Sequence, residues 1–583
     1  MKYVFLLLFY GLILLFTTSC KKKPTAIKES SKKEVVISKF AKNYPDFNPQ
    51  KLRELLQADL QSDSILDPFY TTIKYTPIWV HDTLDTKNLN MLIDILDNVD
   101  EHGLSSELFS LSRIKTIAES IDSGVYSNSL DTLYIKMSIL ERISTSAIIK
   151  YASGMQFGFL RPADLYGKDY DITVGIADSI FFVDLYNSIK QNPIQSLLDS
   201  QPKDSIYIRL QKEYKSLEKM KEADLKPIAS GNATYKLGDK NKHIAEIAQR
   251  LVQTGEYVPD SLTDDSLYRQ LDDHLLAAVN TFRKRMSYPE ENEVGKLTIE
   301  ALNRPVSYYL DRVKANMERY RWKRVKSKHN KHLEVNVASA MLVATQTDSL
   351  PLLMRVCVGS VNNKTPLLQS DIGYLNLNPI WNVPKSIAQK EVAILQKRDT
   401  TYIRRHNMRL YKGGKEVDVA SINWKEVNPS QFNYLIKQDA GNSNSLGLIK
   451  FMFNNAFSVY LHDTPSKATF NRKNRAVSHG CVRVQRPFDL AFFCTSPSTE
   501  LYKDQLLYSV NKSPVTKEGK QLLKEDRLRK LPDIINLKAD NKISLFIDYY
   551  TIFMYPNDDM LYYADDVYGY DNVILEALKP NNQ

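Results

Sequence analysis

The chain has 583 residues, a length that predicts two to four domains. Hydrophobic residues make up 43% and aromatic residues 10%, which is enough for sizeable cores and excludes a chain that is disordered throughout. The net charge of +10 favours an anionic partner, but the sign alone does not distinguish nucleic acid, a membrane surface and an acidic polymer.

The N-terminus has the layout of an export signal. MKYVFLLLFYGLILLFTTSC starts with one lysine, continues as an apolar run and ends in small residues at Cys20, and three lysines follow. It resembles a bacterial lipoprotein signal over residues 1–20, in which Cys20 is lipidated and becomes the first mature residue. An uncleaved membrane anchor is the alternative, because the run is near the shortest length that spans a bilayer. Both predict a periplasmic, membrane-attached protein of the cell envelope, with residues 21–45 as a flexible tether.

Residues 46–235 are predicted to form a helical scaffold domain. Segments such as LNMLIDILDNVDEHGL at 89–104 and LYIKMSILERISTSAIIKYASGM at 133–155 carry apolar residues at spacings of three and four, the period of a helix. This region contains no polar cluster that indicates chemistry. We therefore expect it to have a structural role.

A compact module of three helices is predicted at 236–305. In KHIAEIAQRLVQTGEY an apolar face recurs with helical spacing, and Gly255 is placed to end the helix. The inward-facing positions of the three helices are Ile244, Ile247, Ala248, Leu251, Leu275, Ala278, Val279, Phe282, Ile299 and Leu302. The phrases AQRL, AVNTFRKRM and GKLTIEALN resemble the small peptidoglycan-binding domain of bacterial wall enzymes, and a purely structural bundle is the alternative.

The hydrophobic period changes at about residue 330. HLEVNVASAMLVAT and LPLLMRVCVGS alternate apolar and polar residues in short β-branched runs, which predicts strands. A charged stretch at 386–445 interrupts this pattern, which resumes in GLIKFMF, FSVYLHD and ISLFIDYYTIFMYP. We expect a β-rich domain at 330–575 with a capping insertion at 386–445, and a multidomain α+β fold for the whole chain.

One cysteine has unusual surroundings. Cys357 and Cys494 lie in apolar runs and are expected to be small buried residues, with a disulfide between them left open. Cys481 lies in the polar segment S-H-G-C-V-R, nineteen residues after His462. Strand alternation in FSVYLHD puts Tyr460 and His462 on one face. If the intervening loop folds back, the imidazole can take the thiol proton, as nucleophilic cysteine catalysis requires.

The residues around Cys481 favour this chemistry. Six Lys or Arg residues and one acidic residue lie at 461–486, and positive charge is expected to lower the pKa of the thiol. Gly480 allows close approach of a substrate and can orient amides toward an oxyanion. Arg483 is placed to hold a carboxylate through a bidentate contact.

These residues carry a resemblance to a known family. H-D-T-P followed by S-H-G-C-V-R is similar to the signature of the L,D-transpeptidases with a YkuD-type catalytic domain. MRVCVG, NPIWNVPKSIA, FNRKNRA and the terminal VYGYD are further matches. The chain most resembles the long subgroup, which has a helical scaffold, a peptidoglycan-binding domain and an insertion that caps the active site.

The resemblance implies a role for each residue of the motif. Cys481 is the nucleophile and His462 the general base, while Arg483 anchors the donor. Tyr460 and the amides of Gly480 and Cys481 line the oxyanion side. Ser478 and His479 complete the substrate-binding set, and His479 stands where members of the long subgroup can have serine.

The resemblance also implies the reaction and its partners. Cys481 attacks a tetrapeptide stem of peptidoglycan after its third residue, D-alanine leaves, and the amine of an acceptor stem resolves the thioester. Carbapenem-type β-lactams are expected to acylate the same thiol. Transfer to water, which makes an L,D-carboxypeptidase, or to a protein lysine would use the same site.

Other classes of function are less well supported by the sequence. A non-catalytic wall-binding lipoprotein is the competing hypothesis, and the intact set of His462, Cys481 and Arg483 disfavours it. A zinc site from His462, His479 and Cys481 matches no structural zinc spacing, so neither a metal nor another cofactor is expected. The basic residues are scattered and no nucleic-acid motif is present, so nucleic acid is not an expected partner.

Overall fold

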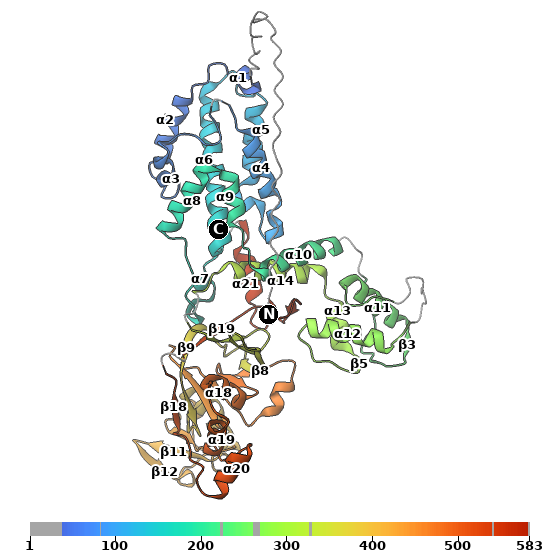
Figure 1. The fold of residues 1–583 in the computed structure, drawn as a ribbon, viewed down its shortest axis with the longest axis vertical. Helices are drawn as coiled ribbons and strands as arrows, with labels where there is room; N and C mark the ends of the chain where they lie inside the picture. Colours follow the sequence, from blue (N-terminus) through green and yellow to red (C-terminus); the bar gives the residue numbers. More distant parts are fainter. Residues whose placement is uncertain are drawn as a thin grey trace, which may run out of the picture.

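The computed structural model describes residues 38–81, 83–221, 226–259, 269–325, 329–538 and 542–580. Figure 1 shows an elongated molecule with a bundle of helices at one end, a β-rich domain at the other and a small helical module that extends to one side. The N-terminal part is helical and the C-terminal part holds a large sheet. The predicted multidomain α+β fold is therefore confirmed.

The helical part begins earlier than the sequence pattern suggests. Helix α1 (Lys39–Asn43) lies inside the segment predicted to be a tether, and Phe40 and Tyr44 are buried. The Tyr44 hydroxyl donates to the carbonyl of Ile121 at 2.9 Å. Lys39 and Lys42 make this segment look polar, so its composition does not indicate that the two aromatic residues are buried. The predicted signal and Cys20 lie outside the described residues, and within those residues no helix is both long and apolar enough to cross a membrane.

The bundle is organised around helix α6 (Leu130–Phe157), whose 28 residues include fifteen that are buried. Polar caps start its neighbours: Asn48 accepts from the N–H of Gln50, and Asp85 accepts from the N–H of Asn88. The other helices are α2 (Pro49–Leu60), α3 (Leu66–Thr72), α4 (Thr86–Asp97), α5 (Leu111–Asp122), α7 (Pro162–Tyr166), α8 (Ser179–Gln191) and α9 (Pro193–Ser200).

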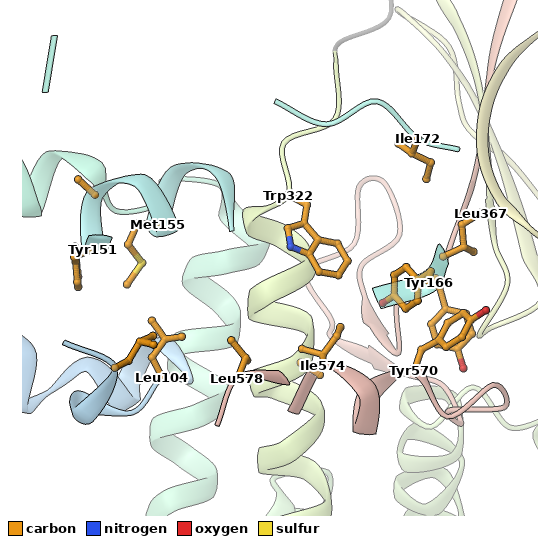
Figure 2. Close-up of a cluster of buried hydrophobic side chains, with 14 of the residues drawn as sticks. Leu104, Tyr151, Met155, Tyr166, Ile172, Trp322, Leu367, Tyr570, Ile574 and Leu578 are labelled. Carbon is orange, nitrogen blue, oxygen red and sulfur yellow. The ribbon is translucent and has the colours of Figure 1, made fainter. Parts of the chain in front are cut away.

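The helical bundle, the lateral module and the β-rich domain meet at helix α14 (Val306–Arg321) and the C-terminal helix α21 (Tyr570–Ala577). Figure 2 shows side chains of the bundle, of the residue after α14 and of α21 in one apolar cluster. Asp571 joins the two helices, because it pairs with Arg312 at 3.0 Å and with Arg319 at 2.5 Å. The last helix is thus a core element that holds the bundle against the β-rich domain.

The lateral module contains the three predicted helices, α11 (Lys242–Thr254), α12 (Asp273–Arg285) and α13 (Lys296–Leu302). All the predicted inward positions are buried. Gly255 ends α11 with a φ of +85°, a conformation that glycine adopts without strain. Two short ribbons complete the module: β2 (Tyr235–Lys236) with β5 (Glu293–Val294), and β3 (Lys240–Asn241) with β4 (Arg269–Gln270).

Helix α10 (Ser205–Lys221) lies in the segment predicted as scaffold, and it also packs on the lateral module. Leu210, Tyr214 and Leu217 share one core with the module helices and α14. The module therefore has a larger core than three short helices could make by themselves.

The β-rich domain is built on a sheet that closes on itself. Strands β9, β14, β15, β17, β8, β7, β6 and β19 follow one another, and β19 pairs with both β6 and β9. These strands are β6 (Lys331–Asn336), β7 (Met341–Gln346), β8 (Leu352–Gly359), β9 (Leu367–Leu377), β14 (Ile449–Phe453), β15 (Leu461–His462), β17 (Val482–Val484) and β19 (Ile543–Asp548). A strand from the helical part, β1 (Tyr170–Asp171), extends the sheet beside β9.

Shorter elements complete this domain. Strand β16 (Ala476–Ser478) pairs with β8, β18 (Ile534–Asn536) pairs with β9, and β20 (Ile552–Phe553) pairs with β21 (Tyr562–Tyr563). The helices are α18 (Pro487–Thr495), α19 (Glu500–Ser509) and α20 (Lys517–Lys524).

The charged stretch within this domain folds as a subdomain of its own, which we call the insertion subdomain (residues 381–438). Its sheet has the order β10 (Trp381–Val383), β13 (Leu435–Gln438), β11 (Met408–Lys412) and β12 (Lys415–Val417). Helices α15 (Lys385–Ile387), α16 (Ala393–Arg398) and α17 (Tyr402–Arg405) pack on it, around a separate apolar core. Strands β11 and β12 protrude at the lower end of Figure 1.

Candidate active site

Two neighbouring strands bring the predicted site residues together. β15 and β17 are parallel, with His462 opposite Arg483. Because side chains alternate along a strand, Tyr460 and Cys481, two positions earlier on each chain segment, project to the same face. The rings of Tyr460 and His462 are 5.7 Å apart. Cys481 and His462 are therefore diagonal neighbours on one face of the sheet.

The strand that ends at His462 is shorter than FSVYLHD suggests, and β15 has only two residues. The reason is Asn455, whose side-chain oxygen accepts from the N–H groups of Phe457 at 3.0 Å and Val459 at 3.2 Å. These bonds hold the preceding residues in a turn. The predicted alternation nevertheless extends back to Tyr460.

The loop before Cys481 is held by a hydroxyl network. The Ser478 hydroxyl donates to the carbonyl of Cys481 at 2.6 Å and accepts from the N–H of Gly480 at 3.2 Å. The Thr365 hydroxyl donates to the carbonyl of Gly480 at 2.8 Å. Gly480 has a φ of +114°, which L side chains rarely adopt. Ser478 is buried and its hydroxyl serves the shape of this loop.

The thiol of Cys481 does not titrate as the sequence suggests. Burial raises its pKa above the usual range, and the backbone and hydroxyl of Tyr460, then the charges of Lys450 and Arg483, lower it only in part. The prediction of a lowered pKa is therefore wrong for the protein without substrate. Removal of the thiol from water outweighs the nearby positive charge.

Most of the basic residues counted in the sequence act elsewhere. Among the six, Arg483 is the residue that contributes to the shift of the Cys481 pKa. The others that make defined contacts are Lys467 with Asp463 (2.5 Å), Lys473 with Asp565 (3.2 Å), Arg475 with the carbonyl of Ser339 (2.7 Å) and Arg486 with the carbonyl of Leu353 (2.6 Å). These contacts fasten the long loop to the domain.

His462 is buried and arranged to act as a base. Its Nδ1 lies 2.5 Å from the carbonyl oxygen of Asp463, so Nδ1 carries the hydrogen and Nε2 keeps its lone pair. Burial, followed by the charge of Arg483, lowers the pKa of His462 to about 4. The imidazole is therefore neutral at neutral pH. The carbonyl, and not the carboxylate, of Asp463 orients it.

Lys450 is a site residue that the sequence analysis missed. It lies on β14 directly opposite His462, and its Nζ is 3.7 Å from the centroid of the Tyr460 ring. Its charge influences both Cys481 and His462. The available signal was one lysine in the otherwise apolar run I-K-F-M-F, at an alternate position of a predicted strand.

The insertion subdomain reaches the site through two side chains. Trp381 and Cys481 both lie close enough to the Tyr460 hydroxyl to influence its pKa. Glu391 is hydrogen-bonded to Nε2 of His479. His479 is thus turned toward the insertion subdomain. Within the described ranges, no three His, Cys, Asp or Glu side chains form a group suited to a metal ion.

The other two described cysteines are interior residues. Cys357 on β8 and Cys494 on α18 are free and fully buried, which confirms the expected role and leaves them unpaired. Burial raises the pKa of both thiols, that of Cys494 to about 12. Among the described cysteines, Cys481 alone is partly exposed.

Two parts of the chain match known protein families. Residues 330–511 match the L,D-transpeptidase catalytic domain family YkuD, and residues 64–213 match the Scaffold domain family. The chain thus combines a helical scaffold domain with a YkuD L,D-transpeptidase catalytic domain, as the resemblance predicts. This family carries out acyl transfer.

Individual relatives are similar over part of the chain. A protein of Haemophilus influenzae named "Putative L,D-transpeptidase" is 32% identical over 243 residues, which are 41% of this chain and 44% of that protein. The match thus spans less than half of the relative. A crystal structure of an L,D-transpeptidase (Yku) from Stackebrandtia nassauensis shares 16% identity and covers 45% of this chain and 91% of that chain. Its TM-score of 0.20 does not by itself indicate a shared fold.

Proposed function

We propose that this protein is an L,D-transpeptidase of the cell envelope, with Cys481 as nucleophile and His462 as general base. One observation carries the proposal. A partly exposed thiol, a neutral buried imidazole and two cations, Lys450 and Arg483, share one sheet region of a domain that matches L,D-transpeptidases. No other described cysteine has such surroundings.

Activation of the thiol begins from its protonated form. Because burial keeps Cys481 neutral, the proton must leave as the sulfur attacks, and the lone pair on Nε2 of His462 is the acceptor on that face. The resulting imidazolium is stabilised by the Asp463 carbonyl on Nδ1. A base with a pKa near 4 in the free protein gives up this proton readily to a leaving amine.

In the acylation step, Sγ of Cys481 attacks the carbonyl carbon of the third residue of a tetrapeptide stem. The tetrahedral oxyanion forms beside the Tyr460 hydroxyl, which Trp381 of the insertion subdomain approaches. The C–N bond to D-alanine then breaks, and the leaving nitrogen takes the proton from His462. The products are free D-alanine and a thioester on Cys481.

In the second step, the side-chain amine of another stem attacks the thioester carbonyl. His462 takes a proton from the amine, the C–S bond breaks, and the proton returns to the sulfur. The product is a bond between the third residues of two stems. Water in place of the amine gives a carboxypeptidase, and a protein lysine gives a wall-anchored protein, so exclusion of water by the insertion subdomain decides the outcome.

The test is a muropeptide assay with the protein from residue 21 onward and purified disaccharide-tetrapeptides, read by mass spectrometry. We expect dimers that have lost one D-alanine. The variant Cys481→Ala is expected to form none, and Cys494→Ala, which removes an interior thiol, is the control for loss of a cysteine as such. Tripeptides without dimers identify a carboxypeptidase. Unchanged substrate with all three proteins contradicts catalysis.

Carbapenem-type β-lactams provide an independent probe of the same thiol. Their strained amide imitates the acyl donor, so we expect a stable adduct on the peptide that contains Cys481. Intact-protein mass spectrometry after incubation measures it. An adduct of equal yield on Cys481→Ala contradicts the assignment.

Wall binding without catalysis is the second candidate, and one observation favours it. A cavity of about 310 Å³ lies between α10, the module helices and residues 559–561, and it is lined by Arg209, Arg250, Arg285 and Arg304. Arg285 is paired with Glu256 at 2.7 Å and Arg304 with Asp565 at 2.9 Å, so much of this charge is already compensated. Retention of Cys481→Ala on purified sacculi measures binding separately from the reaction.

Attachment to a membrane through a lipidated Cys20 belongs to the same proposal. The layout of residues 1–20 supports it, and the periplasmic location follows from it. Metabolic labelling with a clickable fatty acid, in the full chain and in Cys20→Ala, tests the modification.

A further inference from the structure

Lys450 occupies an unusual position for a lysine. It lies on a central strand of the closed sheet, between two apolar residues whose side chains point to the core, Ile449 and Phe451. Its own side chain points to the face that carries His462, and its ammonium group lies over the ring of Tyr460. A half-buried ammonium group at this place loses hydration, which a structural role would not require.

Neither cation of this face has an acidic partner. Within the described residues, no ion pair joins Lys450 or Arg483 to a carboxylate, and the buried Nε of Arg483 has no hydrogen-bond partner. The carboxylate of Asp463, the residue after His462, already has other partners: it pairs with Lys467 and accepts from the N–H groups of Leu448 and Thr464. Two uncompensated cations beside a thiol form a site for an anion.

We propose that Lys450 binds, together with Arg483, a carboxylate of the donor stem peptide and so selects donors that carry this charge next to the scissile bond. This inference rests on the proposed function for the identity of the donor, and it adds Lys450 as a substrate-binding residue. The carboxylate belongs either to the C-terminal D-alanine or to the side chain of the third residue. Either carboxylate would make the same contacts with the two cations.

Binding of this carboxylate also changes the electrostatics of the two reacting groups. A bound carboxylate neutralises charge that otherwise acts on Cys481 and His462, since both cations influence both groups. Loss of that charge removes the largest electrostatic factor opposing protonation of His462. Substrate binding therefore raises the proton affinity of the imidazole and of the thiol together, so the proton passes to His462 only as the sulfur attacks.

The first test uses small alkylating agents and needs no knowledge of the substrate. Iodoacetate and iodoacetamide both displace iodide with the Cys481 sulfur, but only iodoacetate carries a carboxylate. We measure both rates on the full chain by quantifying the modified Cys481 peptide. In Lys450→Met the ratio of the iodoacetate rate to the iodoacetamide rate is expected to fall about tenfold, as loss of a charge-assisted contact predicts.

Two further variants show whether a change in this ratio is due to the charge at position 450. Lys450→Arg keeps the charge and should keep the ratio within about threefold. Lys437→Met is the matched control, because Lys437 is also a half-buried strand lysine over a tyrosine ring, at 4.9 Å from that of Tyr411 in the insertion subdomain. An unchanged ratio in Lys450→Met, or equal slowing with both reagents, overturns the proposal, since the lysine then acts on the thiol or on the fold.

The second test identifies the carboxylate. Four donors are compared: tetrapeptides with a free or an amidated C-terminus, each with or without a carboxylate on the side chain of the third residue. Lys450→Met should raise KM only for donors that carry the recognised carboxylate, which names its source. Equal losses on all four contradict the site. If the wild-type protein turns over no donor while the alkylation ratio still falls in Lys450→Met, the anion site stands and the proposed function fails.

Discussion

The protein buries two histidines near an arginine, and the two clusters differ in how the arginine is partnered. At the junction of bundle and module, Arg321 pairs with Glu318 at 2.8 Å, bonds the Tyr207 hydroxyl and donates to the carbonyl of His102. In the catalytic domain, Arg483 lies opposite His462 and pairs with no carboxylate in the described chain.

Both histidines are held neutral, for the same reason. Burial, followed by the neighbouring arginine, lowers the pKa of His102 to about 3 and that of His462 to about 4. A depressed pKa therefore does not separate structure from function here. The difference lies in the partners: every group of the first cluster is satisfied within the protein, whereas the second leaves a lone pair and two cations for a substrate.

The largest expected effect separates the two histidines by activity. His462→Gln removes the base and should lower D-alanine release by about 10²–10⁴-fold, with a near-normal fold. His102→Gln should leave the rate per folded molecule within about threefold, because His102 lies in the other cluster. The measurement is kcat with circular dichroism on the same samples. Similar losses in both variants would end the distinction.

The second-largest expected effect is a difference in unfolding free energy between variants of the Arg321 cluster and of the Arg483 cluster. Glu318→Gln leaves the fully buried guanidinium of Arg321 without its counter-charge, which should cost about 3–5 kcal/mol of unfolding free energy. Arg483→Met removes a cation that has no acidic partner and should cost clearly less. Urea unfolding of both variants measures this, and a larger loss for Arg483→Met would reverse our interpretation.

The pH dependence of stability sharpens the comparison for His462. Its pKa is about 4 in the folded chain and about 6.5 when unfolded, so below pH 6.5 the unfolded chain takes up a proton that the folded chain cannot. The contribution of His462 to the free energy of unfolding is therefore fully present above pH 6.5. It falls by about 2–3 kcal/mol as the pH decreases toward 4. Between pH 7.5 and 4.5, His462→Gln should lose that much less than the wild type in urea unfolding.

The smallest effect concerns the contact between the insertion subdomain and the loop of the nucleophile. His479 and Glu391 are both partly exposed, so the interaction free energy of their pair should be only about 0.2–1 kcal/mol. A double-mutant cycle with His479→Gln and Glu391→Gln, read as the ratio of cross-linked dimer to hydrolysed tripeptide, tests whether the contact excludes water. Additive single effects would mean that it does not.

Much of the architecture could be predicted because it depends on local patterns. The apolar faces of α11, α12 and α13 are buried as their periods predict, and β6 alternates between buried and more exposed residues. The stop at Gly255 follows from its backbone freedom. Predictions that depended on composition were less accurate: residues 39–44 are lysine-rich yet contribute Phe40 and Tyr44 to the core.

By itself, the sequence determined the motif of the site and the alternation that sets Tyr460 and His462 on one face, because both are properties of neighbouring residues. Only the tertiary structure decided that Lys450 lies opposite His462, that Trp381 reaches Tyr460, and that the basic loop is tied down elsewhere. It also decided the direction of the Cys481 pKa shift. Burial and charge pairing are set by segments that are distant in the chain, so no count of nearby basic residues could reveal them.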